Sequence, residues 1–285
     1  MNSDLMTIGI VCKTSSENPW LERLLASIEL IPSGLGCLPE IIIEEGAQFT
    51  KVEKKIRVFR NCKTPYLLMM EDDTELVTPG YANAFLNSVV ALPGVAIVGP
   101  AEVGFGITQE QAAPQLIHSV QDATNLGGFC MFLDTRFGIC WDARVQTIDD
   151  LQLCLAARIQ GRRVLRCLAT AVRHTKEPWL RDGIPAWEQG DRRRYDEEQY
   201  GKESHQKKRL AECRLLLDWY GDLARQSVPM ELMAILEPQR VPVDGVTQIA
   251  PGCTDCHKSL TMQDSYVMFQ SSYPLCVDCF LKRRT

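Results

Sequence analysis

The segment from Tyr66 to Glu75 constrains the fold of this chain more than any other part of it. Five hydrophobic residues, Tyr66 to Met70, are followed at once by three acids, Glu71, Asp72 and Asp73. A hydrophobic run of this kind predicts a strand that is buried on both faces, as in the parallel sheets of α/β proteins. The three acids would then lie at the carboxyl edge of the sheet, where such folds bind their ligands.

The three adjacent carboxylates restrict the chemistry that this edge can perform. Neighbouring carboxylates repel one another, so a fold that places them together usually supplies a cation. Oxygen ligands favour Mg²⁺ or Mn²⁺, and such an ion suits a diphosphate. The alternative is a solvated acidic turn after a strand, and the segment alone does not decide between the two.

Length and composition are those of an ordinary globular protein. The 285 residues suffice for one large α/β domain and a small appendage. Hydrophobic residues make up 45% of the chain and charged residues 24%, as is typical of soluble proteins. No apolar run is long enough to span a bilayer, and residues 1–14 lack the layout of a signal peptide. We therefore expect no membrane partner and a cytoplasmic location, which is the host cytoplasm if a phage encodes the chain.

Hydrophobic runs alternate with helical patterns over the first part of the chain. The patterns predict strands at residues 6–12, 39–46, 66–70, 95–99, 127–133 and 163–172. They predict helices at residues 19–28, 51–61, 79–92, 148–160 (closed by Gly161) and 211–224, and a loop at 104–125. Such alternation predicts a layered α/β fold with a mostly parallel sheet. We divide the chain into an α/β domain at residues 1–176, a helical extension with linker at 177–245 and a small module at 246–285.

Four phrases resemble the family 2 glycosyltransferases of the GT-A fold, and they come in that family's order. They are Pro39–Ala47 (PEIIIEEGA), Tyr66–Tyr81 (YLLMMEDDTELVTPGY), Asp149–Gly161 (DDLQLCLAARIQG) and Ala171–His174 (AVRH). The resemblance implies a Rossmann-like central sheet flanked by helices. It also implies an enzyme, an inverting and metal-dependent transferase that uses a nucleotide-sugar donor, taken here as a UDP-sugar, and Mn²⁺ or Mg²⁺.

The same resemblance implies which residues form the site. Glu71 and Asp73 match the metal-side positions of the family's Asp-x-Asp segment, although Glu71 replaces an aspartate. His174 matches a histidine that completes the metal site in many members. Asp150 matches the base that takes the proton of the acceptor hydroxyl. Asp149 either assists acceptor positioning or favours the helix N-terminus through the helix dipole.

The contacts implied for the nucleotide and the donor sugar lie mainly in loops after the early strands. They are Thr14, Ser15, Glu44, Glu45, Arg57, Asp72, Gly127 and Gly128. Arg57 would approach the diphosphate, and Asp72 would orient the ribose or the water shell of the ion. The two glycines resemble a small-residue turn that admits the donor sugar closely. Each of these positions is equally compatible with an ordinary loop or helix surface.

Four cysteines near the C-terminus form the most specific single pattern of the chain. Cys253-x-x-Cys256 and Cys276-x-x-Cys279 are separated by nineteen residues. Four thiolates at this spacing predict a structural Zn²⁺ in a zinc-ribbon-like module, because Zn²⁺ prefers four ligands in a tetrahedron. Cys253 to His257 also spells the haem-attachment pattern, but the second cysteine pair and the missing export signal argue against haem. A module of forty residues depends on the metal for stability.

The charge distribution bears on the acceptor. The net charge is −5, yet residues 158–225 carry 16 Lys and Arg against 11 Asp and Glu. This block also contains the run Arg192–Arg194 and the aromatic residues Trp179, Trp187, Tyr195 and Tyr200. Basic groups interleaved with aromatic rings suit a nucleic acid, and the chain is similar in outline to phage glycosyltransferases that modify hydroxymethylated bases in DNA. The alternative is that this basic block is an ordinary solvated helical face.

Two other acceptors and one other class of protein remain open. The hydroxyl acceptor is alternatively a protein or a polysaccharide. Gln152 and Ala156 stand where the family often has Asp and Arg, so part of its acceptor-side charge network is missing. These departures favour a rival hypothesis, in which a decayed transferase domain presents the zinc module to a partner without catalysis.

Overall fold

The structure, a computed structural model, describes residues 5–12, 18–103, 120–174, 180–181, 184–185, 205–236, 266–269 and 273–276. The chain divides into two compact units, Met1–Leu232 and Met233–Thr285. In the part of the chain that the structure describes, no helix is both long enough and apolar enough to cross a membrane.

The first unit is built on an eight-stranded sheet with the order β2-β1-β3-β7-β5-β8-β4, and β6 pairs with β8. The strands are β1 (Met6–Val11), β2 (Glu40–Glu44), β3 (Tyr66–Glu71), β4 (Thr74–Leu76), β5 (Val95–Val103), β6 (Val120–Asp122), β7 (Cys130–Asp134) and β8 (Arg163–His174). Strands β1, β2, β3, β5 and β8 run in one direction, and β4, β6 and β7 run against them. The sheet is therefore mixed but mostly parallel, as the sequence predicts.

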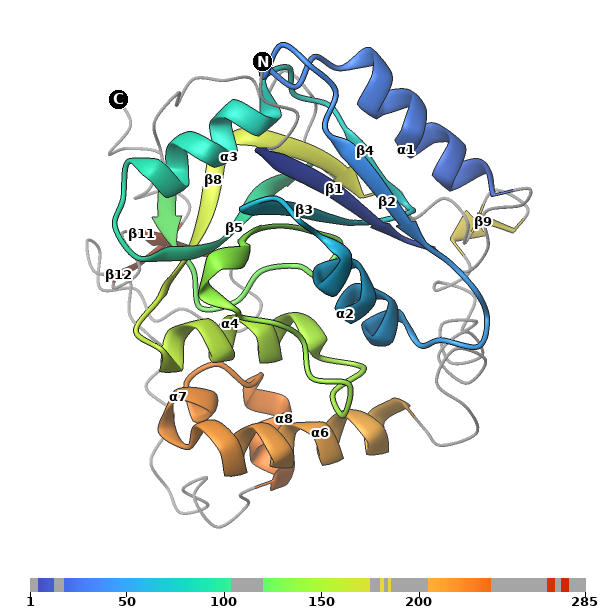
Figure 1. Cartoon of the computed structure of the whole chain (residues 1–285). Helices are drawn as coiled ribbons and strands as arrows, with labels where there is room; N and C mark the ends of the chain where they lie inside the picture. Colours follow the sequence, from blue (N-terminus) through green and yellow to red (C-terminus); the bar gives the residue numbers. More distant parts are fainter. Residues whose placement is uncertain are drawn as a thin grey trace. The chain divides into compact units, whose positions relative to one another are not determined.

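Helices cover both faces of this sheet. They are α1 (Pro19–Leu30), α2 (Lys51–Asn61), α3 (Tyr81–Val90) and α4 (Asp149–Ile159), with a 3-10 turn, η1, at Thr135–Phe137. Figure 1 shows α1 and α3 on one side of the sheet and α2 and α4 on the other. The buried side chains separate into two clusters in the same way, one shared with α1 and α3 and the other with α2 and α4. This confirms the layered α/β architecture.

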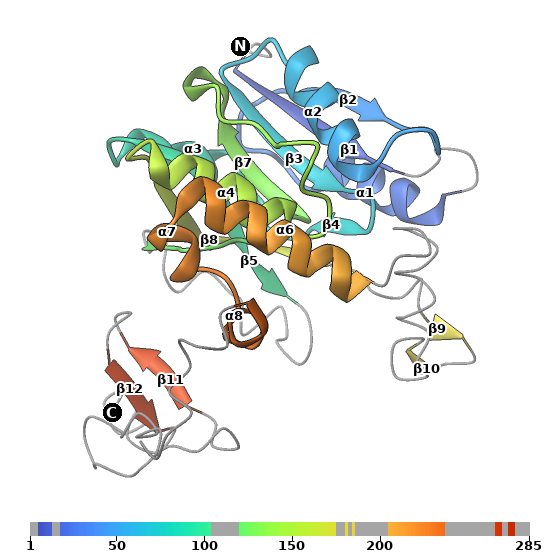
Figure 2. The same ribbon diagram turned by 90° about the horizontal axis from the view of Figure 1, so that it is seen from below.

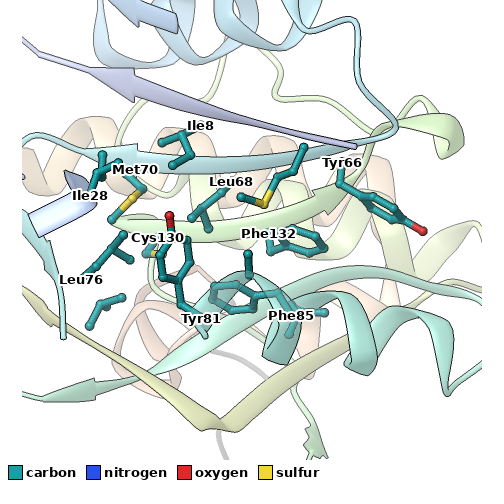
Figure 3. Close-up of a cluster of buried hydrophobic side chains, with 14 of the residues drawn as sticks. Ile8, Ile28, Tyr66, Leu68, Met70, Leu76, Tyr81, Phe85, Cys130 and Phe132 are labelled. Atoms are coloured by element: carbon teal, nitrogen blue, oxygen red, sulfur yellow. The ribbon is translucent and has the colours of Figure 1, made fainter. Parts of the chain in front are cut away.

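Strand β3 contributes to both clusters, which explains why its residues Tyr66 to Met70 are all hydrophobic. Leu68 and Met70 point to the α1 and α3 side, whereas Leu67 and Met69 point to the α2 and α4 side. On the first side the rings of Phe85 and Phe132 stack with their centroids 5.2 Å apart (Figure 3). Each of the four aliphatic β3 side chains is fully buried, so β3 is a central strand whose carboxyl end is fixed rigidly in place.

Local sequence signals set the ends of the helices that lie near this edge. Asn18 caps α1, and its Oδ1 accepts hydrogen bonds from the backbone N–H groups of Trp20 and Leu21. Thr50 and Glu53 form a reciprocal capping box at the start of α2. Gly161 follows α4 with a φ of +68°, as predicted for the residue that closes this helix.

The helical extension packs against α4. It contains α6 (His205–Tyr220) and α7 (Asp222–Arg225), and α8 (Met230–Leu236) spans the division between the two units. Figure 2 shows α6 running alongside α4. Two short hairpins complete the described elements: β9 (Leu180–Arg181) with β10 (Ile184–Pro185), and β11 (Tyr266–Phe269) with β12 (Tyr273–Cys276).

Several element boundaries differ from those predicted. Strand β8 continues to His174, and α6 begins at His205, earlier than the predicted residue 211. Strands β4 and β6 were not predicted, because each has three residues and neither forms a long hydrophobic run. The hydrophobic run at 127–133 correctly predicts β7, but a short run carries no information about strand direction, and β7 is antiparallel to both neighbours.

Candidate functional site

The carboxyl ends of three parallel strands meet at one edge of the sheet. In the register, Val11 of β1 lies opposite Glu44 of β2 on one side and Glu71 of β3 on the other. The backbone N–H of Glu71 also donates to the carbonyl of Phe129, 2.9 Å away. Glu71 and the acids that follow it are thus held at the carboxyl edge of the sheet, the edge at which open α/β sheets generally bind ligands.

The turn after β3 brings Asp73 and His174 together. Strand β4 pairs with β8 so that Thr74 lies opposite His174. His174 Nε2 lies 3.3 Å from Asp73 Oδ2, and the His174 ring stacks on Phe129 with their centroids 4.5 Å apart. The second carboxylate oxygen, Asp73 Oδ1, is buried and has no hydrogen-bond partner among the described residues. An unpaired buried carboxylate oxygen is costly unless a ligand satisfies it.

The neighbouring carboxylate, Asp72, is held by helix α1. Asn18 Nδ2 donates a hydrogen bond to Asp72 Oδ2 at 2.7 Å, while Asn18 Oδ1 caps the helix. Burial raises the pKa of Asp72 to about 6, and the hydrogen bond from Asn18 opposes that shift, whereas the charges of Asp73 and Glu71 add to it. Asp72 therefore does not share the environment of Asp73, although the two are adjacent in the chain.

Glu71 faces two lysines of helix α2. Lys55 Nζ lies 2.9 Å from Glu71 Oε1, and Lys51 Nζ lies 3.2 Å from the same oxygen. Burial alone would raise the pKa of Glu71, but the charges of Lys51 and Lys55 and the hydrogen bond from Lys55 lower it below its ordinary value. Glu71 is thus an ionised carboxylate whose charge the protein itself neutralises.

The same two lysines hold Asp149, the first residue of α4. Lys55 Nζ lies 2.8 Å from Asp149 Oδ2, and Lys51 Nζ lies 3.6 Å from Asp149 Oδ1. Lys55 also donates to the carbonyl of Gly128 at 3.1 Å, and its ammonium group lies 5.7 Å from the centre of the Trp141 ring. Lys51, Lys55, Glu71 and Asp149 therefore form one cluster of two cations and two carboxylates.

Asp150 lies beside this cluster and differs from Asp149. A Cβ atom built on Gly128 would lie 3.2 Å from both Asp150 Cβ and Lys55 Nζ, so only glycine fits between them without displacement. Burial, followed by the charge of Asp149, raises the pKa of Asp150 to about 6, although Lys55 and Lys51 partly offset this. The result is a carboxylate poised to gain or lose a proton near neutral pH.

Helix α6 fixes the loop that leads into α4. Glu212 is buried and accepts hydrogen bonds from the backbone N–H groups of Gln146 at 2.9 Å and Thr147 at 2.8 Å. It also accepts one from Thr147 Oγ1 at 2.6 Å. The side chain of Ile148, which precedes the helix, supplies no cap. Glu212, which is distant in the sequence, therefore orders the loop that immediately precedes Asp149 and Asp150.

The residues at the β3–β4 turn fit a divalent ion that is shared with a ligand. Within the described ranges no group of three or more His, Cys, Asp or Glu side chains could hold a metal by itself. Asp73 and His174 lie together, and the unsatisfied Asp73 Oδ1 offers a hard oxygen ligand. Mg²⁺ and Mn²⁺ commonly take few protein ligands and complete their shell with phosphate oxygens and water.

The remaining predicted residues form contacts of their own or lie outside the described residues. Arg57 Nε lies 2.7 Å from Glu44 Oε2, and its guanidinium group lies 4.5 Å from the centre of the Phe49 ring. Glu45 follows and is exposed. A Cβ atom on Gly127 would meet the ring of Phe129 at 2.2 Å, so this glycine serves local packing. Thr14, Ser15, Cys253, Cys256 and Cys279 lie outside the described residues, as does the side chain of Cys276.

Sequence reasoning missed five residues of the site: Asn18, Lys51, Lys55, Phe129 and Glu212. The spacing of Lys51 and Lys55 places both on one face of α2, which was a usable signal. The hydrogen bonds of Glu212 join residues 65 positions apart, and nothing local in the sequence indicates them.

Comparisons with known proteins do not assign the chain to a family. A scan against models of known families finds no match. A search of characterised protein sequences also finds none. Similar solved structures include GalNAc-T7 with UDP, GalNAc and Mn²⁺, which is 10% identical with a TM-score of 0.48 over 63% of this chain and 44% of that chain. This chain thus spans less than half the length of GalNAc-T7.

Two further structures are similar at the same level. S. aureus TarS 1–349 is 9% identical with a TM-score of 0.45, covering 81% of this chain and 83% of that chain. A197 from STIV is 12% identical with a TM-score of 0.39, covering 60% of this chain and 85% of that chain. Because all three TM-scores lie below 0.5, these likenesses carry no conclusion about activity.

Proposed function

We propose that this protein is a metal-dependent glycosyltransferase that moves a sugar from a nucleotide-sugar donor to a hydroxyl group. The observation that carries the proposal is the position of two adjacent residues, Gly128 and Phe129. Gly128 lies against Asp150, whose raised pKa suits a general base, and Phe129 stacks on His174, the partner of Asp73. A base and a cation-binding pair on either side of one turn match what transfer from a diphosphate requires.

The reaction needs two functions that these residues supply separately. Asp150 takes the proton of the acceptor hydroxyl as its oxygen attacks the anomeric carbon, while the bond from that carbon to the diphosphate oxygen breaks. Asp73 and His174 would hold a Mn²⁺ or Mg²⁺ ion, which neutralises charge on the leaving diphosphate. With a single base and direct attack, the configuration of the sugar inverts. Asp72 is proposed to orient the ribose or the water shell of the ion, and the hydrogen bond from Asn18 would fix its carboxylate for that role.

The proposed donor is a UDP-sugar, and the first acceptor to test is hydroxymethylated DNA. The support for DNA is the basic block at residues 158–225, with its interleaved aromatic side chains. Thr14, Ser15, Glu44, Glu45 and Arg57 are proposed contacts to the nucleotide. Protein and polysaccharide hydroxyls are the alternative acceptors.

The C-terminal cysteines are proposed to bind one structural Zn²⁺, independent of the ion at Asp73. The paired Cys-x-x-Cys spacing supports this proposal. Metal analysis of freshly purified protein should find about one zinc per chain, and Cys276→Ser should lose it. Wild-type protein that contains no zinc would refute the module.

Incubation with nucleotide sugars tests the proposed activity. Purified protein is mixed with UDP- and GDP-sugars and Mn²⁺, with and without a hydroxymethylated duplex, and an unmodified duplex serves as the control. Release of UDP and a matching mass increase of the duplex support the proposal. If no donor is consumed with either duplex and the protein does not bind UDP, the result contradicts the proposal and favours the rival hypothesis of a non-catalytic binding protein.

A further inference from the structure

The buried ammonium group of Lys55 is the least expected feature of the site. Its side chain is fully buried, and its Nζ contacts Glu71 Oε1 at 2.9 Å, Asp149 Oδ2 at 2.8 Å and the carbonyl of Gly128 at 3.1 Å. These three partners come from β3, from the start of α4 and from the turn before β7. Lys55 therefore joins three separate segments through one charged group.

We propose that Lys55 is a positioning residue that ties the acidic segment after β3 to the helix that carries the base, with Glu71 as its counter-ion and not a metal ligand. The proposal rests on the proposed function and deepens it. We call the group formed by Lys55, Glu71 and Asp149 the Lys55 cross-link.

The charges in the cluster support this role for Glu71. Glu71 Oε1 is shared by the ammonium groups of Lys51 and Lys55 at 3.2 Å and 2.9 Å. Among the groups in ion-pair contact, two cations face two carboxylates, Glu71 and Asp149, so these four charges sum to zero. Among the described residues, Asp73 Oδ1 is a buried oxygen without a hydrogen-bond partner, whereas no buried oxygen of Glu71 lacks one. A divalent ion placed against Glu71 would face two ammonium groups at close range, and like charges at such distances repel one another.

The Lys55 cross-link also separates the roles of Asp149 and Asp150. Asp149 is 3% exposed and its Oδ2 is bound to Lys55, so it anchors the first turn of α4. The position of the next residue, Asp150, is then set by the first turn of α4. Lys55 holds this turn through Asp149, and Glu212 holds the loop before it through Thr147. Buried ion pairs contribute little net stability, and fixing geometry is one reason for a fold to retain them.

Three variants test the Lys55 cross-link: Glu71→Gln, Lys55→Met and the two combined. Glu71→Gln should keep Mn²⁺-supported UDP binding within about threefold of wild type, because it removes no metal ligand. Lys55→Met should lower kcat by roughly 10²-fold with little change in the donor KM, the size of effect expected from displacing a catalytic group by about 1 Å. Arg60→Met, an exposed cation in the last turn of α2, is the matched control.

The combined variant separates a buried-charge effect from lost packing. Removing Lys55 alone leaves two carboxylates, Glu71 and Asp149, to share the single cation Lys51, whereas the combined variant leaves Asp149 paired with Lys51. The combined variant should therefore have a Tm roughly 5 °C above that of Lys55→Met and recover part of its kcat. The Tm comparison reports the pairing even if Lys55→Met is too unstable for kinetics.

Each outcome is decisive for one of the two claims. Loss of Mn²⁺-supported UDP binding in Glu71→Gln, at the level of Asp73→Asn, would make Glu71 a metal ligand and overturn the inference alone. A combined variant no more stable than Lys55→Met, or a kcat of Lys55→Met equal to that of Arg60→Met, would overturn it too. Wild-type protein that binds no UDP overturns the proposed function itself.

Discussion

The two acidic regions of the site differ in how far the protein satisfies their charges. In the turn after β3, Asp73 has one partner, His174 at 3.3 Å, and one buried oxygen with no hydrogen bond from the described residues. At the start of α4, Asp149 binds Lys55 and Lys51, and the preceding loop donates three hydrogen bonds to Glu212. We call the turn after β3 the incomplete region, because one of its carboxylate oxygens lacks a partner among the described residues. We call the start of α4 the cross-linked region, because the lysines of α2 bind Asp149 and Glu212 of α6 binds the preceding loop.

This difference indicates a division of labour. A carboxylate left unsatisfied is ready to bind a cation that arrives with the substrate, since the ligand supplies the missing contacts. A base must instead be held at a fixed position before the substrate arrives, because its contribution depends on geometry. Buried contacts around Asp149 serve that purpose, so we expect substitutions in the two regions to have different consequences.

The largest effect is expected for Asp150→Asn. An amide cannot accept the acceptor's proton, so transfer should fall by about 10²- to 10⁴-fold while UDP binding with Mn²⁺ stays unchanged. Steady-state kinetics and calorimetry measure the two properties separately. Asp122→Asn, an exposed carboxylate that pairs with Arg163, is the control. Transfer at the wild-type rate in Asp150→Asn would place the base elsewhere, and the start of α4 would then no longer be the region that positions it.

The next largest effect is expected for Asp73→Asn, in the incomplete region. Substitutions next to metal ligands cost about 10- to 100-fold in metal affinity, so loss of a ligand itself should weaken Mn²⁺-supported UDP binding by about 100-fold or more. The Tm should change little or rise, because the variant neutralises a carboxylate whose buried Oδ1 has no hydrogen-bond partner among the described residues. Glu75→Gln, two residues further along and paired with Arg173, is the control. Undiminished binding by Asp73→Asn in calorimetry contradicts the assignment.

The sequence predicts one region of the site better than the other, for a physical reason. The acids after β3 are found because a doubly buried strand is hydrophobic at every position, so its end is visible as a sudden change to Glu71, Asp72 and Asp73. His174 lies two residues beyond the strand predicted at 163–172, and its place in the site was implied by the resemblance of Ala171–His174 to a glycosyltransferase segment. Periodicity therefore accounts for the position of the three acids, and the resemblance accounts for that of His174.

The contacts that fix α4 could not be predicted, because they join distant parts of the chain. Lys55 and Asp149 are 94 positions apart, and Thr147 and Glu212 are 65 positions apart. Glu212 lies in a block that composition describes only as basic. The pattern of α2 predicted a basic helix and favoured Arg57, yet Arg57 pairs with Glu44 while Lys55 points inward. A charged side chain in a helix is normally expected at the surface.

A smaller effect is expected when the pH is lowered. The raised pKa of Asp150, about 6, means that the base loses its free lone pair as the pH falls through that value. We therefore expect kcat/KM to fall about tenfold for each unit of pH below 6. The pKa of Asp72 is also raised to about 6, so wild-type data alone do not identify the group. Asp150→Asn should abolish the inflection and Asp72→Asn should retain it, and the opposite result would assign the titration to the incomplete region.

Stability should respond to the same titration in the opposite sense. A folded-state pKa above the unfolded value means that the folded chain binds the proton more tightly. The stabilising contribution of the protonated Asp150 is complete below pH about 4 and is lost as the pH rises through about 6. The difference between the Tm of Asp150→Asn and the Tm of wild type should therefore increase as the pH is raised from 4 to 7, which thermal melts at each pH measure.

The smallest effect is expected for Glu212→Gln, and it tests whether the cross-linked region is ordered by α6. The backbone N–H groups of Gln146 and Thr147 donate to the two carboxylate oxygens of Glu212, one to each. In Glu212→Gln an NH₂ group replaces one of these oxygens, so one backbone N–H group loses its acceptor. Leaving a buried group unsatisfied costs about 1–3 kcal/mol, which corresponds to a fall in Tm of several degrees. We expect kcat to fall by about 3- to 10-fold, because the turn that aims Asp150 loosens. UDP binding with Mn²⁺ should not change, since Asp73 and His174 belong to the other region. Asp218→Asn, an exposed acid on the same helix, is the control. A loss of UDP binding in Glu212→Gln that matches its loss of kcat would show that the two regions behave as one unit, and the division of labour argued from their contacts would be wrong.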